Sequence, residues 1–152
     1  MNSLNTGIMT LKEALGLDRE KMVSVIGAGG KTTTLYRLAR ELWEGGEKVL
    51  LTTTTKIFKP ASPHVHKLYL AHDLEALRCQ LADIEGPMIV AAGSALDFPG
   101  KLTGLPPVWL DELAEVGEMD RILVEADGAA SRYFKAPLEY EPVVPELCPL
   151  IL

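Results

Sequence analysis

Residues 23–33 read Val-Ser-Val-Ile-Gly-Ala-Gly-Gly-Lys-Thr-Thr, an apolar segment that runs into a glycine-rich turn and then into Lys31 and two threonines. The apolar stretch 22–27 predicts a buried strand, and a helix is expected to begin at Lys31 and to end at Gly45. This helix is indicated by one apolar stripe at helical spacing: Leu35, Leu38, Ala39, Leu42 and Trp43. A strand, a glycine turn and a helix in this order gather backbone N–H groups around one point, which we expect to bind an anion.

The glycine-rich turn is expected to hold the phosphates of a nucleotide. Glycine lets the backbone approach a phosphate closely, Lys31 can reach the terminal phosphates, and the Thr32 hydroxyl is placed to bind Mg²⁺. The strict pattern GxxxxGK[ST] requires glycine where this chain has Val25, so the match is to a shorter loop, GxxGK[ST], that begins at Gly27. The predicted nucleotide-binding residues are Gly27, Ala28, Gly29, Gly30, Lys31, Thr32, Thr33, Thr54 and Lys56.

Two other interpretations of this turn are less consistent with the sequence. A dinucleotide-binding loop needs GxGxxG, but its third glycine falls on Thr32, and no acidic residue ends the second predicted strand to bind a ribose. A plain turn would leave Lys31 at the positive end of a helix, which costs about a few tenths of a kcal/mol without an anion. We therefore expect a phosphate site and do not expect NAD.

A further apolar strand, predicted over residues 121–125, ends in Glu125 and is soon followed by Asp127. This pattern is typical of a Walker B strand. In a parallel sheet both carboxylates would emerge at the same edge as the glycine turn, where they can hold Mg²⁺ or polarise an attacking water. We therefore predict Lys31, Glu125 and Asp127 as catalytic residues. The predicted Mg²⁺ ligands are Thr32, Glu125 and Asp127.

The segment Thr52-Thr-Thr-Thr55-Lys56 closes the second predicted strand, 48–55, and is expected to open onto the same crevice. Its hydroxyls and ammonium, with Thr54 and Lys56 as the candidates, can contact a phosphate or a second substrate. The equal alternative is that threonine simply favours strands and that Lys56 is only solvated. The sequence leaves both interpretations open.

The rest of the pattern predicts an α/β fold. The further elements are strands over 67–70 and 87–92, a helix capped by Asp73, a helix over 108–116, and a long loop over 93–107. Strands that alternate with helices form crossover units with a mostly parallel sheet. We predict a single domain over residues 1–152, with a three-layer P-loop NTPase-like fold and helices that flank the sheet.

Composition argues against several classes of protein. The formal net charge is -6, so no nucleic-acid partner is expected. No apolar run approaches the roughly 18 residues of a membrane span, and the chain starts without a secretory signal, so no membrane and a cytoplasmic location are expected. Cys79 and Cys148 form no CxxC pair, and His64 and His66 lack a third ligand at a fixed spacing, so neither a disulfide framework nor a zinc site is predicted.

The chain closes on an apolar Cys-Pro-Leu-Ile-Leu after several prolines. Such residues belong more often inside a fold than at a free end. We therefore expect that a C-terminal portion is missing here or that a partner surface covers this end.

Three blocks, VSVIGAGGKTTTL, KVLLTTTTKIFKP and VEADGAASRYFKAPLEYEPVVP, resemble the signature blocks of the YqeC-type selenium cofactor biosynthesis proteins. These proteins are also described as accessory proteins of selenium-dependent molybdenum hydroxylases. The resemblance runs from about Leu11 to Pro145. It implies a P-loop nucleotide-binding fold, a role in maturing a molybdenum hydroxylase with its labile selenium, and family members that are longer than this chain.

By the family's motif, Glu125 and Asp127 with residues 135–137 form the wall opposite the nucleotide-binding residues, which are Gly27, Gly29, Gly30, Lys31, Thr32 and Thr33. We therefore expect ATP or GTP to bind with Mg²⁺ and to be hydrolysed, or its phosphoryl group transferred, during assembly of a selenium-containing molybdenum cofactor. The alternative is a non-hydrolysing, nucleotide-gated adaptor or carrier for selenium or cofactor. No base-reading NKxD motif is present, so the sequence does not distinguish ATP from GTP.

Overall fold

The computed structural model describes residues 8–127, 142–148 and 150–151. Its helices are α1 (Leu11–Ala14), α2 (Lys31–Glu44), α3 (Leu74–Ala82) and α4 (Pro107–Val116). Its strands are β1 (Met22–Val25), β2 (Val49–Thr53), β3 (Lys56–Phe58), β4 (Lys67–Leu70), β5 (Ile89–Gly93), β6 (Ala95–Asp97), β7 (Lys101–Thr103), β8 (Arg121–Glu125) and β9 (Leu150–Ile151). None of these helices is long and apolar enough to span a bilayer.

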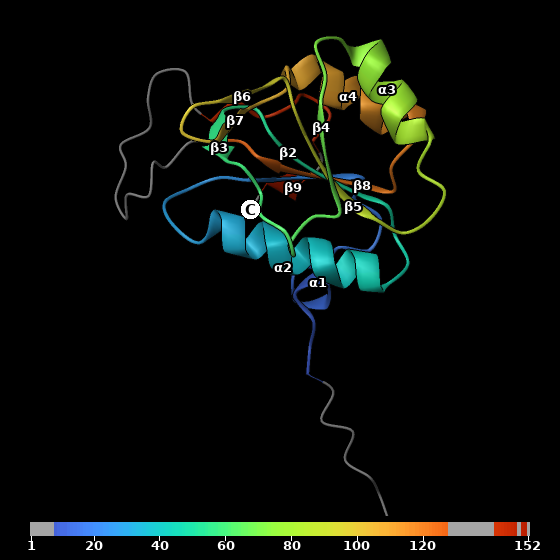
Figure 1. Ribbon diagram of the computed structural model, residues 1–152. Coiled ribbons are helices and arrows are strands. Elements are labelled where there is room, and N and C mark those ends of the chain that lie inside the picture. The colour runs from blue at the N-terminus through green and yellow to red at the C-terminus, as the bar shows by residue number, and fades with distance from the viewer. Residues whose placement is uncertain (1–7, 128–141, 149, 152) are drawn as a thin grey trace, which may run out of the picture.

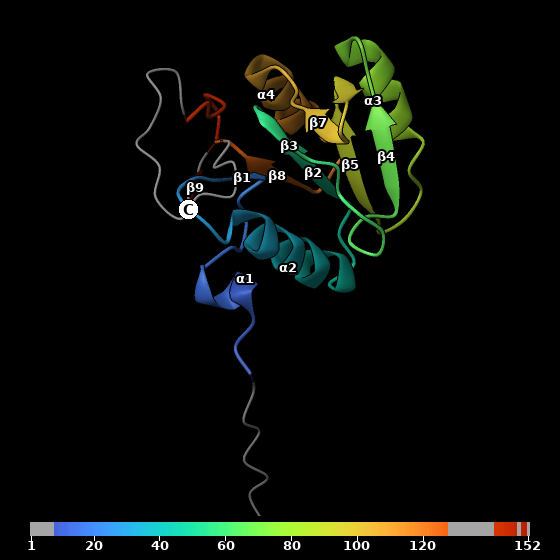
Figure 2. The ribbon, with the colours of Figure 1, turned by 60° about the vertical axis from the view of Figure 1, so that its left-hand side comes forward.

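The larger sheet has the strand order β4-β5-β2-β8-β1-β9, and every neighbouring pair in it runs parallel. Figures 1 and 2 show α2 on one side of this sheet and α3 and α4 on the other. The predicted α/β class, with a mostly parallel sheet and flanking helices, is therefore confirmed.

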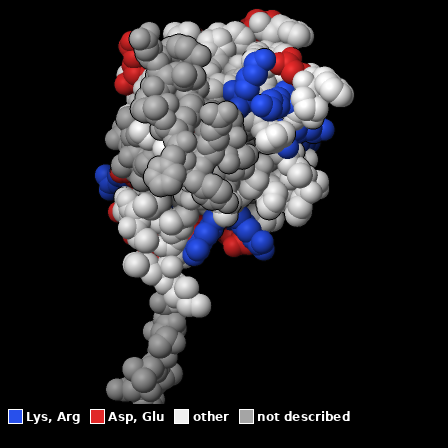
Figure 3. Space-filling model, turned by 90° about the vertical axis from the view of Figure 1, so that its left-hand side faces the viewer, with Lys and Arg blue, Asp and Glu red and all other residues white. Residues whose placement is uncertain are grey.

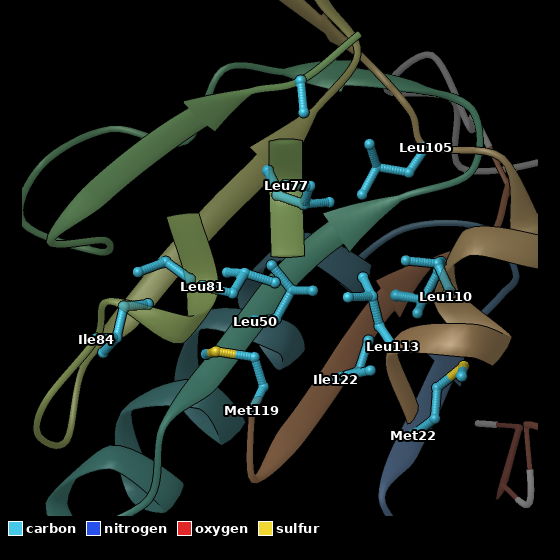
Figure 4. Close-up of a cluster of buried hydrophobic side chains, with 14 of the residues drawn as sticks. Met22, Leu50, Leu77, Leu81, Ile84, Leu105, Leu110, Leu113, Met119 and Ile122 are labelled. Atoms are coloured by element: carbon cyan, nitrogen blue, oxygen red, sulfur yellow. The ribbon is translucent and has the colours of Figure 1, made fainter. Parts of the chain in front are cut away.

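Apolar cores fill both faces of the sheet. Alternate strand residues such as Met22, Leu50 and Ile122 pack with leucines of α3 and α4, as Figure 4 shows. Their neighbours Val23 and Leu51 belong to the other core, which α2 covers. Successive side chains of a strand point to opposite faces, so a strand that is covered on both faces carries a continuous apolar run. This explains why the central strands were predictable from the sequence.

Strand β8 lies between β1 and β2, which brings the carboxyl ends of the three strands together. The parallel register pairs Glu125 with Val25 of β1 and with Thr53 of β2. The chain after Val25 turns into α2, so the start of this helix and the end of β8 lie at the same edge of the sheet.

The predicted long loop over 93–107 is wrong, because this segment contains β6 and β7. These two strands pair antiparallel, and β7 also pairs with β3 to form a second, three-stranded sheet. The predicted strand over 48–55 is also shorter than expected, since β2 ends at Thr53 and a bend leads into β3. These strands have only three residues each, and β3 pairs with the distant β7, which local sequence patterns do not show.

Gly104 attaches this small sheet to the end of β2, and its replacement by alanine is expected to destabilise the fold. An added Cβ would lie 2.5 Å from the Thr53 carbonyl oxygen, so the backbone must shift. We expect the free energy of unfolding in a urea titration to fall by about 2–3 kcal/mol. Gly86→Ala is the matched control, because a Cβ at Gly86 meets no atom within 4 Å. Equal stability of the two variants would contradict this account of the packing.

Candidate functional site

The glycine loop, residues 26–30, joins β1 to α2 and holds three glycines in the left-handed region. Their φ angles are 104° at Gly27, 81° at Gly29 and 75° at Gly30, a conformation that residues with a Cβ rarely adopt. A Cβ at any of the three would meet no protein atom within 4 Å. The backbone conformation, and not a lack of room inside the protein, therefore requires glycine here.

The backbone N–H groups of residues 28–33 are candidates for binding an anion. Within the described residues none of them donates to a protein acceptor, whereas the Thr34 amide donates to the Gly30 carbonyl at 2.9 Å and begins the helical pattern. The loop residues are exposed. Six open donors thus lie at the positive end of a helix of 14 residues. This arrangement can bind a phosphate through its backbone alone.

The structure brings Lys31, Thr32, Glu125 and Asp127 together, as predicted. The Lys31 side chain is buried, and its Nζ lies 3.0 Å from Asp127 Oδ1 and also donates to the Gly27 carbonyl oxygen. The second Asp127 oxygen accepts a hydrogen bond from the Gly27 amide at 2.8 Å. The Thr32 hydroxyl donates to Glu125 Oε2 at 3.0 Å. The first turn of α2 and the end of β8 therefore form one cluster of charged and polar groups.

Glu125 lies in an environment that favours its neutral form. Burial raises the pKa of its carboxyl, and the charge of Asp127 raises this pKa further, while the Thr32 hydrogen bond and the Lys31 ammonium act in the opposite direction. Burial also raises the pKa of the Tyr36 hydroxyl, with a further contribution from the charge of Glu125. Glu125 is thus a better proton acceptor than a solvent-exposed glutamate.

Replacing Glu125 by glutamine is expected to stabilise the ligand-free protein at neutral pH. Because the folded-state pKa is raised, the folded chain binds more protons than the unfolded chain between the two pKa values, so stability falls as the pH rises through this window. Glutamine has no such proton to lose. We expect the variant to melt about a few degrees above the wild type at pH 7.5, with the difference shrinking towards about pH 4. A variant that melts below the wild type at pH 7.5 would contradict this.

The side chains of Thr54 and Lys56 bond to groups outside this cluster. The Thr54 hydroxyl donates to the Val143 carbonyl oxygen, and Lys56 Nζ forms an exposed ion pair with Asp97 at 2.7 Å. Figure 3 shows the side of the molecule that lies on the left in Figure 1, where basic and acidic side chains lie next to one another. A role for Thr54 and Lys56 in binding stays a prediction.

Thr53 is a residue of the site edge that the sequence prediction did not select. It is buried, and its hydroxyl donates to the Glu125 carbonyl oxygen at 2.7 Å. The Thr54 amide donates to the same oxygen at 3.2 Å. These bonds fix the end of β8 and so the position of the Glu125 side chain. The strand pairing that places Thr53 beside Glu125 cannot be read from the sequence of either segment.

The imidazoles of His64 and His66 make other contacts. His64 stacks on Tyr36 with ring centroids 4.2 Å apart, and His66 Nδ1 accepts a hydrogen bond from the Ile89 amide at 3.0 Å. Across the described ranges no three His, Cys, Asp or Glu residues are grouped so that they could hold a metal ion by themselves. The predicted wall residues 135–137 lie outside the described part of the chain.

A family model described as YqeC protein matches residues 23–152, which include the glycine loop and β8. The chain belongs to the YqeC family. A relative from Escherichia coli (strain K12), described as "Uncharacterized protein YqeC", is 38% identical over 128 residues. The alignment covers 84% of this chain and 48% of the relative, so the chain spans about half the length of that protein. No solved structure gives a significant match.

Membership of the YqeC family confirms the resemblance of the three sequence blocks. Two of these blocks contain the cluster described above, because the glycine loop lies in the first block and Glu125 and Asp127 lie in the third. In this YqeC-family chain the two blocks meet through the Thr32–Glu125 hydrogen bond and the Lys31–Asp127 ion pair.

Proposed function

We propose that this chain is a Mg²⁺-dependent, ATP- or GTP-binding P-loop protein that hydrolyses the nucleotide or transfers its phosphoryl group. The observation that carries the proposal is the set of open amides at residues 28–33 beside the Lys31 ammonium. A ligand with several acceptor oxygens and negative charge can accept from several of these donors at once. A polyphosphate fits this requirement.

The fold supports the same proposal. In this chain β1, which leads into the glycine loop, lies directly beside β8, which ends in the carboxylates. The two strands are parallel, and helices cover both faces of the sheet. This arrangement supports the proposed three-layer P-loop NTPase-like fold, in which ligands bind at the carboxyl ends of the strands.

Thr32 fits a direct ligand of Mg²⁺, and Glu125 fits a group that would hold a water bound to this ion. Their side-chain oxygens lie 3.0 Å apart at the first turn of α2. Mg²⁺ usually takes one or two protein oxygens and completes its shell with water and phosphate oxygens, so a larger group of carboxylates is not needed. Bound there, Mg²⁺ would neutralise charge on the phosphate oxygens.

Lys31, the loop amides and Glu125 would have different roles in the reaction. Lys31 and the loop amides would stabilise charge that develops on the β- and γ-phosphate oxygens. Glu125 would orient a nucleophile and take up its proton, for which its raised pKa suits it. The acceptor of the phosphoryl group is water in the hydrolytic form of the proposal.

We also propose a place in the maturation of selenium-dependent molybdenum hydroxylases. The proposed partners are the nucleotide and such a hydroxylase or its cofactor machinery. The proposed location is the cytoplasm. This proposed role in hydroxylase maturation rests on the resemblance of the sequence blocks to selenium cofactor biosynthesis proteins.

A non-hydrolysing, nucleotide-gated adaptor is the second candidate. It is favoured by one observation, the ion pair between Lys31 and Asp127. A phosphate that takes over Lys31 would release Asp127 at the end of β8, so nucleotide binding would be coupled to the chain that follows this strand.

Titration calorimetry and a phosphate-release assay test the proposal. We expect ATP or GTP with Mg²⁺ to bind with a Kd below about 100 µM. Release of phosphate, by the chain alone or in the presence of the hydroxylase partner, supports the enzymatic form of the proposal. Binding without release in both conditions supports the adaptor. Absence of binding for both nucleotides would overturn the proposal.

A further inference from the structure

Asp127 contacts both ends of the glycine loop. Oδ2 accepts from the Gly27 amide at 2.8 Å, and Oδ1 lies 3.0 Å from Lys31 Nζ. Its side chain is only 14% exposed, and that of Lys31 only 4%. The sequence prediction assigned Asp127 to the metal, but in the structure its carboxylate holds the two groups that a phosphate would use.

Among the described residues, the charged side chains at the loop give no net positive charge. Lys31 faces Asp127, and Glu125 adds a second carboxylate on Thr32. The next cations along α2, Arg37 and Arg40, are paired with Glu41 and Glu44. Within the described residues, the open amides therefore have no unpaired cation beside them on α2 to attract a free anion.

A ligand must compensate Asp127 before it can use Lys31. A free polyphosphate brings only negative charge to an edge where Asp127 already offsets the charge of Lys31. A polyphosphate that carries Mg²⁺ brings two positive charges to the same edge, beside Thr32 and Glu125. The expected difference in affinity between the free and the Mg²⁺-bound polyphosphate is therefore electrostatic and requires no additional contact with the protein.

We infer that Asp127 is a specificity determinant that restricts the glycine loop to metal-bound polyphosphate and rejects free polyphosphate and pyrophosphate. This inference rests on the proposed nucleotide binding and adds the form of the substrate. Asp127 acts here through Lys31 and Gly27, and not as a metal ligand. The two roles lead to opposite expectations for a neutral substitution.

The test is Asp127→Asn, with ATP and pyrophosphate titrated once with Mg²⁺ and once with EDTA. The wild type should bind Mg²⁺–ATP at least about 10-fold more tightly than free ATP. The variant should bind free ATP and pyrophosphate about 10-fold more tightly than the wild type does, while its affinity for Mg²⁺–ATP changes by less than about 3-fold. Asp127→Ser, which also removes the charge and keeps a polar group for Gly27, should behave in the same way.

Glu115→Gln is the matched control, since Glu115 is exposed on α4, on the other side of the sheet from α2. It removes the same charge and should change neither affinity. Weaker binding of Mg²⁺–ATP by Asp127→Asn, with unchanged binding of free ATP, would overturn the inference in favour of a metal ligand and leave the proposed function intact. Equal affinity of the wild type for free and Mg²⁺-bound ATP would also overturn it, and failure of the wild type to bind either would overturn both.

Discussion

Replacing Lys31 by alanine is expected to weaken the binding of Mg²⁺–ATP or Mg²⁺–GTP by about 100-fold or more. Lys31 is the only lysine or arginine in the described glycine loop and first turn of α2, and its ammonium is held beside the open amides by the Gly27 carbonyl and Asp127. Without it, Asp127 would face the phosphates uncompensated. Calorimetry with each nucleotide measures the change directly.

Lys67→Ala is the matched control for this result, because Lys67 is exposed on β4, at the far edge of the sheet. It should leave the affinity unchanged. Thermal melting shows whether the Lys31 variant is folded, and Lys31→Met, which keeps most of the buried side-chain volume, serves as a second variant. Wild-type affinity in folded variants would remove Lys31 from the site.

In the enzyme form of the proposal, Glu125→Gln is expected to lower phosphate release by about 100-fold or more while nucleotide binding remains. Glutamine can still accept the hydrogen bond from Thr32, but it cannot take a proton from the nucleophile. Single-turnover measurements with saturating nucleotide separate this loss from a change in affinity.

The stability of the same variant makes the result easy to interpret. Because Glu125→Gln is expected to melt above the wild type at pH 7.5, lost activity cannot be attributed to unfolding. Glu115→Gln again controls for the change in net charge. Phosphate release at the wild-type rate would show that Glu125 is not the proton acceptor.

Much of the fold could be predicted from the sequence because both faces of the central strands are covered. Segments such as 22–25 and 121–125 are buried at every position, and most of their residues are therefore apolar. The small sheet of β3, β6 and β7 could not be predicted, because its strands have three residues each and β3 pairs with the distant β7. The requirement for glycine at position 104 could not be predicted either. It follows from the close approach of the Thr53 carbonyl oxygen, which leaves no room for a Cβ.

The candidate site residues could be predicted where they lie close together in one segment of the sequence. The glycine loop with Lys31 and Thr32 is such a segment, and the acidic end of β8 is another. The contacts between them were not predictable, because the Asp127 bond to Gly27 joins residues 100 positions apart. The role of Thr53 likewise depends on strand register. Sequence patterns identified the candidate side chains. The parallel order of β1, β8 and β2 determines which of these side chains are in contact.

A crystal structure of the protein with Mg²⁺ and a non-hydrolysable ATP analogue tests the central claim most directly. The account predicts phosphate oxygens about 2.7–3.2 Å from several backbone nitrogens of residues 28–33, with Lys31 turned from Asp127 towards the phosphates. The analogue bound elsewhere, with these amides still open and the Lys31–Asp127 ion pair unchanged, would contradict it.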